Sequence, residues 1–287
     1  MLDTLPPELI KLISNALCIV DIISLKLTCV KTKELPTNIN EKMSNELHKR
    51  FPSIIIQSMK ENNIVITGSF MLRFLYDASW DPNDIDLYIE SEFSDDRWNF
   101  IKCLLKNGYT EIEQAGTPHN YIISRYYTNG AQKLNLVSLA TIDPIYYIFK
   151  VSDTDIGKVA YNCHLTKLYI KDWYKLIKRQ DHIVPLSLIT ASIYDGSIVK
   201  YDQIDNPDQN ILLEPHMLKM YERIEKYNHR GFDLLISPRM NEILTIINDD
   251  YKNFVTDTTK ITKNMYINLQ EYLEKYHTDT SILLQLY

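Results

Sequence analysis

Glycine and cysteine are both scarce in this chain of 287 residues, and their scarcity excludes several classes of protein. Only seven residues are glycine, well below the average usage of about 7%. The sequence has no GxxxxGK[ST] or GxGxxG loop and no GxSxG or HExxH motif, so P-loop NTPases, Rossmann dehydrogenases, serine hydrolases and common zinc proteases lack support. The four cysteines lie far apart without a CxxC pair, which excludes a disulfide framework and a cysteine zinc site. We expect a reducing, cytoplasmic environment.

Long apolar runs and an excess of basic residues are also missing. No run approaches the roughly 18 apolar residues of a membrane helix, and the first residues do not resemble a signal peptide, so we expect no contact with a membrane. The net charge of −6 disfavours a general nucleic-acid coat protein. Residues 61–150 hold 12 acidic and 7 basic side chains. Carboxylates therefore gather in the middle of the chain, where metal chemistry would need them.

The hydrophobic pattern predicts a small helical head, a mixed α/β centre and a mostly helical tail. The domain boundaries that we expect are 1–50, 51–165 and 166–287. Apolar spacing and capping residues predict helices over about 9–17, 21–29 (with Asp21 as the N-cap), 39–50, 70–76 and 95–107. Short apolar or alternating runs predict strands over 64–66, 84–89, 121–127, 134–139 and 151–161.

One constellation in the centre has a chemical meaning. Gly68 and Ser69 follow a short apolar strand, and after fourteen intervening residues Asp84 and Asp86 flank one isoleucine on the next strand. A Gly-Ser turn at the start of a helix lets backbone N–H groups approach a phosphate. Two aspartates separated by one strand residue share a face and can ligate hard divalent cations. A Gly-Ser pair alone is usually a plain turn, and a D-x-D pair alone is usually a solvated strand edge. The two together, in this order, favour a functional site.

These residues resemble the nucleotidyltransferase superfold of DNA polymerase β-like enzymes, whose pattern is hG[GS], a helix, and then Dh[DE]h. The stretch Ser79–Tyr88 is similar to the "W-x-x-[ST/N]-D-I-D-I-F" segment of proteins from large DNA viruses and some eukaryotes. The resemblance implies an α+β fold with a mixed sheet flanked by helices. It also implies transfer of an NMP from an NTP to a hydroxyl, with Mg²⁺ or Mn²⁺ as the cofactor.

A third carboxylate completes the site in this superfold, and it comes from a later strand. The strand around Asn135 offers no charge there. The segment Ser152–Tyr161 resembles "F-D-[IL]-[DS]-I-C-[KR]-V-A-Y" of the same viral-type proteins, but it departs from that pattern at Ser152 and Gly157. We expect Asp153 to be the third catalytic and metal-binding carboxylate, with Asp155 as the alternative on the same strand face.

Basic residues gather between positions 158 and 179. Lys171, Lys175 and Lys178 are expected on one helix face, and Lys158, Lys171 and Lys175 are candidates for binding the substrate phosphates together with Gly68 and Ser69. A solvated helix with an aromatic core side explains the same pattern. The later stretch Tyr221–Phe232 also resembles a segment of the viral-type proteins and predicts a helix that ends at Gly231.

The head resembles an F-box, whose pattern is LPxEL…I…L…D…L…C. The match begins at Leu5 and ends at Cys29, but the aromatic residue that usually follows is absent. The resemblance implies that residues 5–29 dock onto a Skp1-type adaptor through Leu5, Leu9 and Ile13, whereas a plain helical cap is the alternative. The function that we predict is a metal-dependent nucleotidyltransferase acting on RNA, a protein or a small molecule. The alternative is an inactive scaffold or F-box-type adaptor-binding protein.

Overall fold

The computed structural model describes residues 6–28, 38–90, 95–115, 122–140, 142–152, 154–183 and 222–236. The chain divides into two compact units, one comprising Met1–Asp181 with Arg230–Asp233, the other His182–His229 with Leu234–Tyr287. The domain boundaries at residues 50 and 165 stay a prediction. No helix among the described residues has both the length and the apolarity to cross a membrane.

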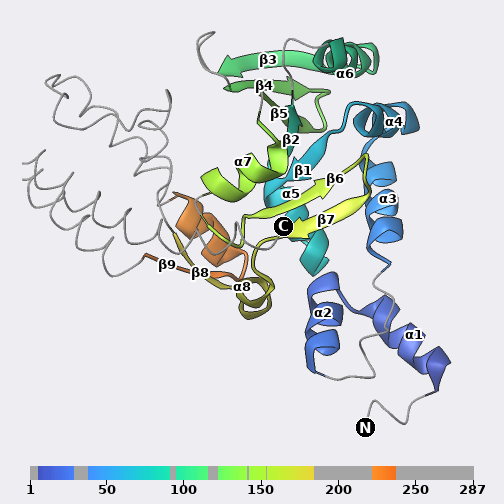
Figure 1. Ribbon diagram of the computed structural model, residues 1–287, viewed down its shortest axis with the longest axis vertical. Coiled ribbons are helices and arrows are strands. Elements are labelled where there is room, and N and C mark those ends of the chain that lie inside the picture. Colours follow the sequence, from blue (N-terminus) through green and yellow to red (C-terminus); the bar gives the residue numbers. More distant parts are fainter. Residues whose placement is uncertain are drawn as a thin grey trace, which may run out of the picture. The chain divides into compact units, whose positions relative to one another are not determined.

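In the described part of the first unit four helices come first, and strands and helices are mixed after them (Figure 1). Its helices are α1 (Pro7–Ala16), α2 (Ile19–Thr28), α3 (Ile39–Arg50), α4 (Ser53–Glu61), α5 (Gly68–Tyr76), α6 (Asp95–Lys106), α7 (Pro144–Val151) and α8 (Trp173–Lys178). Its strands are β1 (Val65–Thr67), β2 (Ile85–Glu90), β3 (Thr110–Ala115), β4 (Ile122–Thr128), β5 (Lys133–Leu139), β6 (Val159–Asn162) and β7 (Lys167–Ile170).

These seven strands form one mixed sheet in the order β3-β4-β5-β2-β1-β6-β7. Strand β2 lies at its centre, parallel to β5 and antiparallel to β1. The sheet therefore brings segments from before residue 70 and after residue 130 to both sides of the Asp84-Ile85-Asp86 segment. The α+β fold class with a mixed sheet flanked by helices is confirmed.

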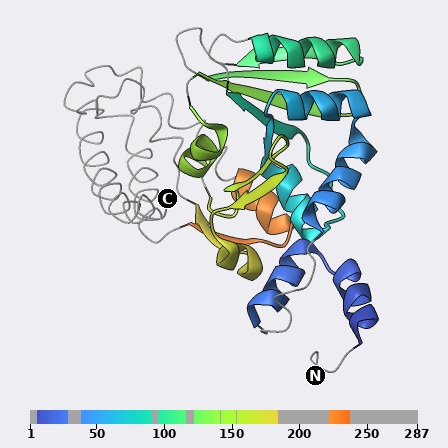
Figure 2. The same ribbon diagram turned by 45° about the vertical axis from the view of Figure 1, so that its right-hand side comes forward.

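The two faces of the sheet differ in polarity because side chains alternate along each strand. On one face, Ile66, Leu87 and Leu136 have no exposed surface. On the other, Asp86 is half-buried between Thr67 and Asn135. Helix α7 packs near the far end of this second face, where Ile148 contacts the cluster around Val65 and Ala160. Figures 1 and 2 show α7 and α4 on opposite sides of the sheet.

Most predicted elements are confirmed, and the differences have local causes. Asp21 is not an N-cap: α2 begins two residues earlier, and the Asp21 backbone N–H meets the Cys18 sulfur at 3.4 Å. Residues 151–161 are not one strand, because α7 extends to Val151 and the described strand of this range, β6, begins at Val159. The start of α7 carries two ordinary signals: Pro144 in the first turn, and the Asp143 carboxylate accepting from the Tyr146 N–H.

The chain beyond residue 165 contains more strand than its hydrophobic pattern predicts. Strands β8 (Gln180–Ile183) and β9 (Asp233–Ile236) form a separate two-stranded sheet, and β7 belongs to the large sheet. Residues 222–229 are helical, and Gly231 has a φ of +81°, as the predicted glycine helix end requires. The expectation of a mostly helical tail for the other residues after 183 lies outside the described residues.

Candidate functional site

The Gly-Ser junction lies between β1 and α5, as the sequence predicts. Gly68 has a φ of +72°, a left-handed conformation that glycine adopts without steric cost. It is the first residue of α5, so the backbone turns sharply from strand to helix there. Ser69 is only 4% exposed. The backbone of the junction, more than the serine hydroxyl, is therefore the part suited to meet a ligand.

The two aspartates lie at the neighbouring strand end. Asp84 is one residue before β2, and Asp86 is its second residue. Both are half-buried, whereas Ile85 between them is buried. Strand alternation therefore directs the two carboxylates to the polar face of the sheet. In the register of the sheet, Asp86 pairs with Thr67, the residue before Gly68.

Gly68 and Asp86 lie in direct proximity. A Cβ atom added at Gly68 would lie 2.1 Å from Oδ2 of Asp86, far inside contact distance. The carboxylate thus occupies the space that any other residue at position 68 would need for its side chain. The two halves of the sequence motif form a single site, and glycine is required there for both its φ and its missing side chain.

A third polar residue from β5 contacts the same carboxylate. Asn135 pairs with Asp86 in the parallel β2–β5 register, and its Nδ2 donates to Oδ1 of Asp86 at 2.9 Å. Its Oδ1 accepts from the Ser124 hydroxyl at 2.6 Å. Tyr126 of β4 pairs with Asn135. Burial raises the pKa of Tyr126, and the negative charges of Asp84 and Asp86 raise it further, whereas a side-chain hydrogen bond with Ser124 lowers it.

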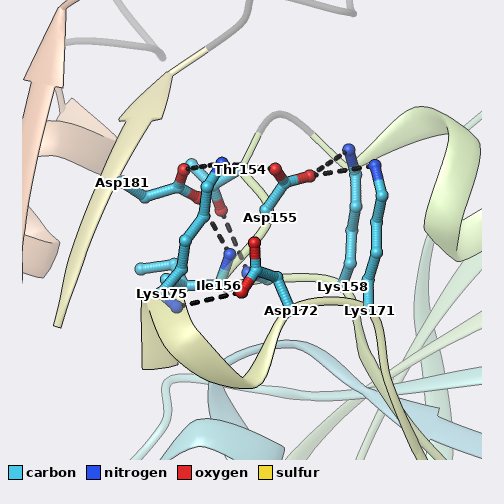
Figure 3. Close-up of polar contacts among 9 residues, drawn as sticks. Thr154, Asp155, Ile156, Lys158, Lys171, Asp172, Lys175 and Asp181 are labelled. Atoms are coloured by element: carbon cyan, nitrogen blue, oxygen red, sulfur yellow. Dashed lines mark hydrogen bonds and ion pairs between the residues drawn. The ribbon is translucent and has the colours of Figure 1, made fainter. Parts of the chain in front are cut away.

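Asp155 lies in a different environment, within a cluster of lysines (Figure 3). Its carboxylate contacts the ammonium groups of Lys158 at 2.8 Å, Lys171 at 3.2 Å and Lys175 at 2.5 Å. Lys175 also pairs with Asp181 at 2.9 Å, and Asp181 accepts from the Ile156 N–H at 2.9 Å. We call these five charged residues, Asp155, Lys158, Lys171, Lys175 and Asp181, the lysine cluster.

The pKa values in the lysine cluster follow from burial and from these ion pairs. Burial alone would raise the pKa of Asp155, but Lys158, Lys175 and Lys171 overcome it and hold that pKa well below its ordinary value. Burial lowers the pKa of Lys158 although Asp155 opposes it. For Lys175 the hydrogen bonds to Asp155 and Asp181 exceed the effect of burial and raise the pKa. Asp155 is therefore ionised and already neutralised by protein cations.

The predicted site residues thus fall into two groups. The first group lies at the Gly-Ser junction and consists of Gly68, Ser69, Asp84 and Asp86. The second group consists of Asp155 and the three predicted phosphate-binding lysines, which all belong to the lysine cluster. Asp153 lies outside the described residues. Within the described ranges no group of three or more His, Cys, Asp or Glu side chains could hold a metal ion. One expectation is wrong: Lys171 does not share a helix face with Lys175 and Lys178, because α8 begins at Trp173.

A network that sequence reasoning missed anchors the loop before Asp84. Asp81 pairs with Arg50 at 3.0 Å and with Arg73 at 3.5 Å, and Glu46 pairs with both arginines. Beside Asp81, the Trp80 ring carries the Arg230 guanidinium 4.1 Å from its centroid. Arg50 and Asp81 are 31 residues apart, and no local spacing marks such a pair. The network connects the loop before Asp84 to α3 and α5, which carry Glu46, Arg50 and Arg73.

Comparison with known proteins gives matches among solved structures alone. No protein-family model matches, and no curated protein matches. The CCA-adding enzyme of Thermotoga maritima in complex with tRNA is 13% identical, with a TM-score of 0.42, over 85% of this chain and 56% of that one. A CCA-adding enzyme in complex with ATP is 10% identical, with a TM-score of 0.43 and the same coverage. This chain thus spans just over half the length of these enzymes.

Proposed function

We propose that this chain is a nucleotidyltransferase-type enzyme that transfers an NMP from an NTP to a hydroxyl acceptor. The observation that carries the proposal is the contact between Gly68 and Asp86, where a Cβ would lie 2.1 Å from the carboxylate. A backbone turn suited to phosphate and a pair of carboxylates suited to a cation thereby occupy one place on the sheet. The nucleotidyltransferase superfold that the sequence resembles also combines a Gly-Ser turn with a pair of strand carboxylates.

The donor set fits a hard divalent cation such as Mg²⁺ or Mn²⁺. Asp84 and Asp86 supply carboxylate oxygens from a half-buried face, and the Asn135 N–H holds Oδ1 of Asp86 at 2.9 Å. A cation held by these carboxylates would neutralise charge on the phosphates of the nucleotide. Asp153 as the third carboxylate, and Lys158, Lys171 and Lys175 as phosphate ligands, remain part of the proposal.

In the proposed reaction the acceptor hydroxyl oxygen bonds to the α-phosphorus of the NTP. The bond from that phosphorus to the oxygen bridging it to the β-phosphorus breaks, and pyrophosphate leaves with that oxygen. The hydroxyl proton passes to solvent or to a nearby base. The chain contributes by positioning and charge: the Gly68 turn receives phosphate oxygens, and the α5 N-terminus adds a favourable dipole. RNA, protein and small molecules all remain possible acceptors.

A second candidate, a scaffold that binds nucleotide without transferring it, has two observations in its favour. Strand β5 is the parallel neighbour of β2, and it presents the neutral Asn135 beside Asp86. Asp155 already has three lysine partners. The site then has the two carboxylates of Asp84 and Asp86, and the proposed third carboxylate is that of Asp153.

The deciding experiment compares the wild type with Asp84→Asn/Asp86→Asn. We expect Mn²⁺-dependent binding of at least one labelled NTP by the wild type and a loss of at least about 100-fold in the variant, because both carboxylates leave the site. The matched control is Asp77→Asn/Glu61→Gln, which removes the same charge from two exposed positions outside the site and outside the Asp81 network.

The outcomes separate the two candidates. Binding together with pyrophosphate release and transfer of α-phosphate label to an acceptor supports the enzyme. Metal-dependent NTP binding without pyrophosphate release, with RNA, protein and small-molecule acceptors each tested, supports the scaffold that binds nucleotide without transferring it. A folded wild type that binds no NTP contradicts both. An equal loss in the control variant would show that overall charge, not the site, controls binding.

Docking of the head onto a Skp1-type adaptor remains a separate prediction. Leu5 lies outside the described residues, Leu9 is 44% exposed, and Ile13 is half-buried. An exposed leucine on α1 is compatible with docking but equally with a helical cap. A binding assay with purified adaptor and the Leu9→Asp variant would distinguish these two roles.

A further inference from the structure

Three polar side chains on neighbouring strands form a hydrogen-bonded row that ends at Asp86. Ser124 lies on β4, Asn135 on β5 and Asp86 on β2. The Ser124 hydroxyl lies 2.6 Å from Oδ1 of Asn135, and Nδ2 of Asn135 lies 2.9 Å from Oδ1 of Asp86. All three side chains lie on the polar face of the sheet, since Ser124 is two residues from Tyr126, the register partner of Asn135.

The direction of these hydrogen bonds is determined by chemistry. An ionised carboxylate can only accept, so Asn135 must present its amide nitrogen to Asp86. The amide oxygen then faces Ser124, and the serine hydroxyl must donate. The row therefore has one consistent orientation while Asp86 is charged. It also leaves Oδ2 of Asp86 on the Gly68 side, where the added Cβ would meet it.

We propose that Asn135, supported by Ser124, is a positioning residue that holds the ionised Asp86 carboxylate as a ligand and limits the protein alone to one divalent cation. This inference rests on the proposed function. Among the described residues Asp84 and Asp86 supply the carboxylates of the site, and together they balance the charge of one such ion; this count does not include Asp153. Asn135 stands beside Asp86 in the register and directs an N–H, not an anionic oxygen, toward the site. A second ion would meet a donor group in place of a ligand.

Two kinds of substitution test this assignment. Asn135→Ala removes the donor to Asp86, and Ser124→Ala removes the support of that donor while it leaves Asn135 in place. Loss of such an outer hydrogen bond typically weakens metal binding by about 10- to 100-fold. We expect that loss for Asn135→Ala and a smaller one for Ser124→Ala. Asn135→Asp supplies a carboxylate in the same register position and should add a second ion.

Two control variants match these changes. Ser138→Ala makes the same change on β5 but on the opposite face, where the Ser138 hydroxyl is buried without a hydrogen-bond partner. Asn99→Asp adds the same charge on an exposed position of α6. Both should bind Mn²⁺ as the wild type does, because neither lies in the hydrogen-bonded row.

The measurement is Mn²⁺ titration of each full-length protein without nucleotide, followed by electron paramagnetic resonance to count bound ions. The proposal is supported if the wild type binds one ion, Asn135→Ala binds one ion with lower affinity, and Asn135→Asp binds two. Three results would overturn it. They are two ions bound by the wild type, unchanged Mn²⁺ affinity in both Asn135→Ala and Ser124→Ala, and one ion bound by a folded Asn135→Asp. In those cases the proposed function survives. A wild type that binds no Mn²⁺ without nucleotide overturns this proposal, and Mn²⁺-dependent NTP binding then decides the proposed function, because a nucleotide can bring its own cation.

Discussion

Asp86 and Asp155 are both partly buried aspartates near the large sheet, but their partners differ in kind. Asp86 accepts from the neutral amide of Asn135 and lies against Gly68. Asp155 accepts from three ammonium groups. The Asn135 amide orients the Asp86 carboxylate without bringing a positive charge to it. A carboxylate neutralised by lysines instead ties together the elements that carry them.

The segments joined by the lysine cluster show what that second arrangement does. Lys158 precedes β6, Lys171 follows β7 and Lys175 lies on α8, so one carboxylate connects three consecutive elements. Lys175 continues the connection to Asp181 on β8, whose side chain has no exposed surface. The same residue type therefore serves structure in one place and is proposed to serve chemistry in the other.

The substitution with the largest expected effect is Gly68→Ala. The new Cβ would force the Asp86 carboxylate away from its position, and the positive φ would cost about 1–2 kcal/mol. We expect nucleotide and Mn²⁺ affinity to fall by at least about 100-fold, as measured by titration, because the cation ligand is displaced.

Gly130→Ala is the matched control for this prediction. Gly130 has a φ of +85°, and a Cβ there would meet nothing within 4 Å. In urea unfolding both variants should lose the stability that the positive φ costs, and Gly68→Ala should lose more because its Cβ also displaces Asp86, but only Gly68→Ala should lose binding. Equal loss of binding in both variants would mean that the backbone conformation, not the contact with Asp86, is what the site requires.

Asp155→Asn should act on stability, with little direct effect on the Asp84 and Asp86 site. It leaves three clustered lysines without their shared anion, and we expect a loss of about 2 kcal/mol in the free energy of unfolding. The lysines lower the pKa of Asp155 in the folded state, so its contribution is present above the ordinary aspartate pKa of about 3.9 and is lost as the pH falls below it.

Urea unfolding of both proteins at pH 7 and at pH 3 checks this prediction. The difference between wild type and Asp155→Asn should be larger at pH 7 than at pH 3. A pH-independent difference would contradict the ion-pair explanation. Loss of Mn²⁺ binding in a folded Asp155→Asn would instead connect Asp155 to the metal site and remove the contrast between the two aspartates.

The smallest effect is expected for Asp81→Asn, which tests an exposed carboxylate. Asp81 is 77% exposed at its side chain although it pairs with Arg50 and Arg73, and exposed pairs contribute less than about 1 kcal/mol. Glu46, at 11% exposed, pairs with the same arginines, so Glu46→Gln should destabilise the protein more in urea unfolding. The reverse order would show that the loop before Asp84 depends on Asp81 itself.

Local patterns predict much of this fold. Helix α3 has the predicted bounds, and β1, α5 and β2 follow one another as the Gly-Ser and Asp-Ile-Asp spacing indicates. These elements are set by neighbours a few residues apart: apolar periodicity, the turn at Gly68 and the alternation around Ile85. Strand β3 and helix α7 escaped prediction, although Asp143 and Pro144 are an ordinary helix start.

The partners of each aspartate could not be predicted in the same way. Asp86 and Asn135 are 49 residues apart, and Lys175 and Asp155 are 20 apart. Which strand lies beside β2, and in which register, depends on the packing of the whole sheet. The sequence places Asp153 and Asp155 on one strand face and favours Asp153 as the third carboxylate, but Asp155 precedes β6 and belongs to the lysine cluster.

The sequence by itself determined that Gly68 and two nearby aspartates belong to one strand–turn–helix–strand unit, because the distances along the chain are short and the residue types are specific. Only the tertiary structure decided that Asn135 stands beside Asp86 and that three lysines surround Asp155. Long-range pairing follows from burying the apolar faces of many elements at once, and no local pattern records its outcome.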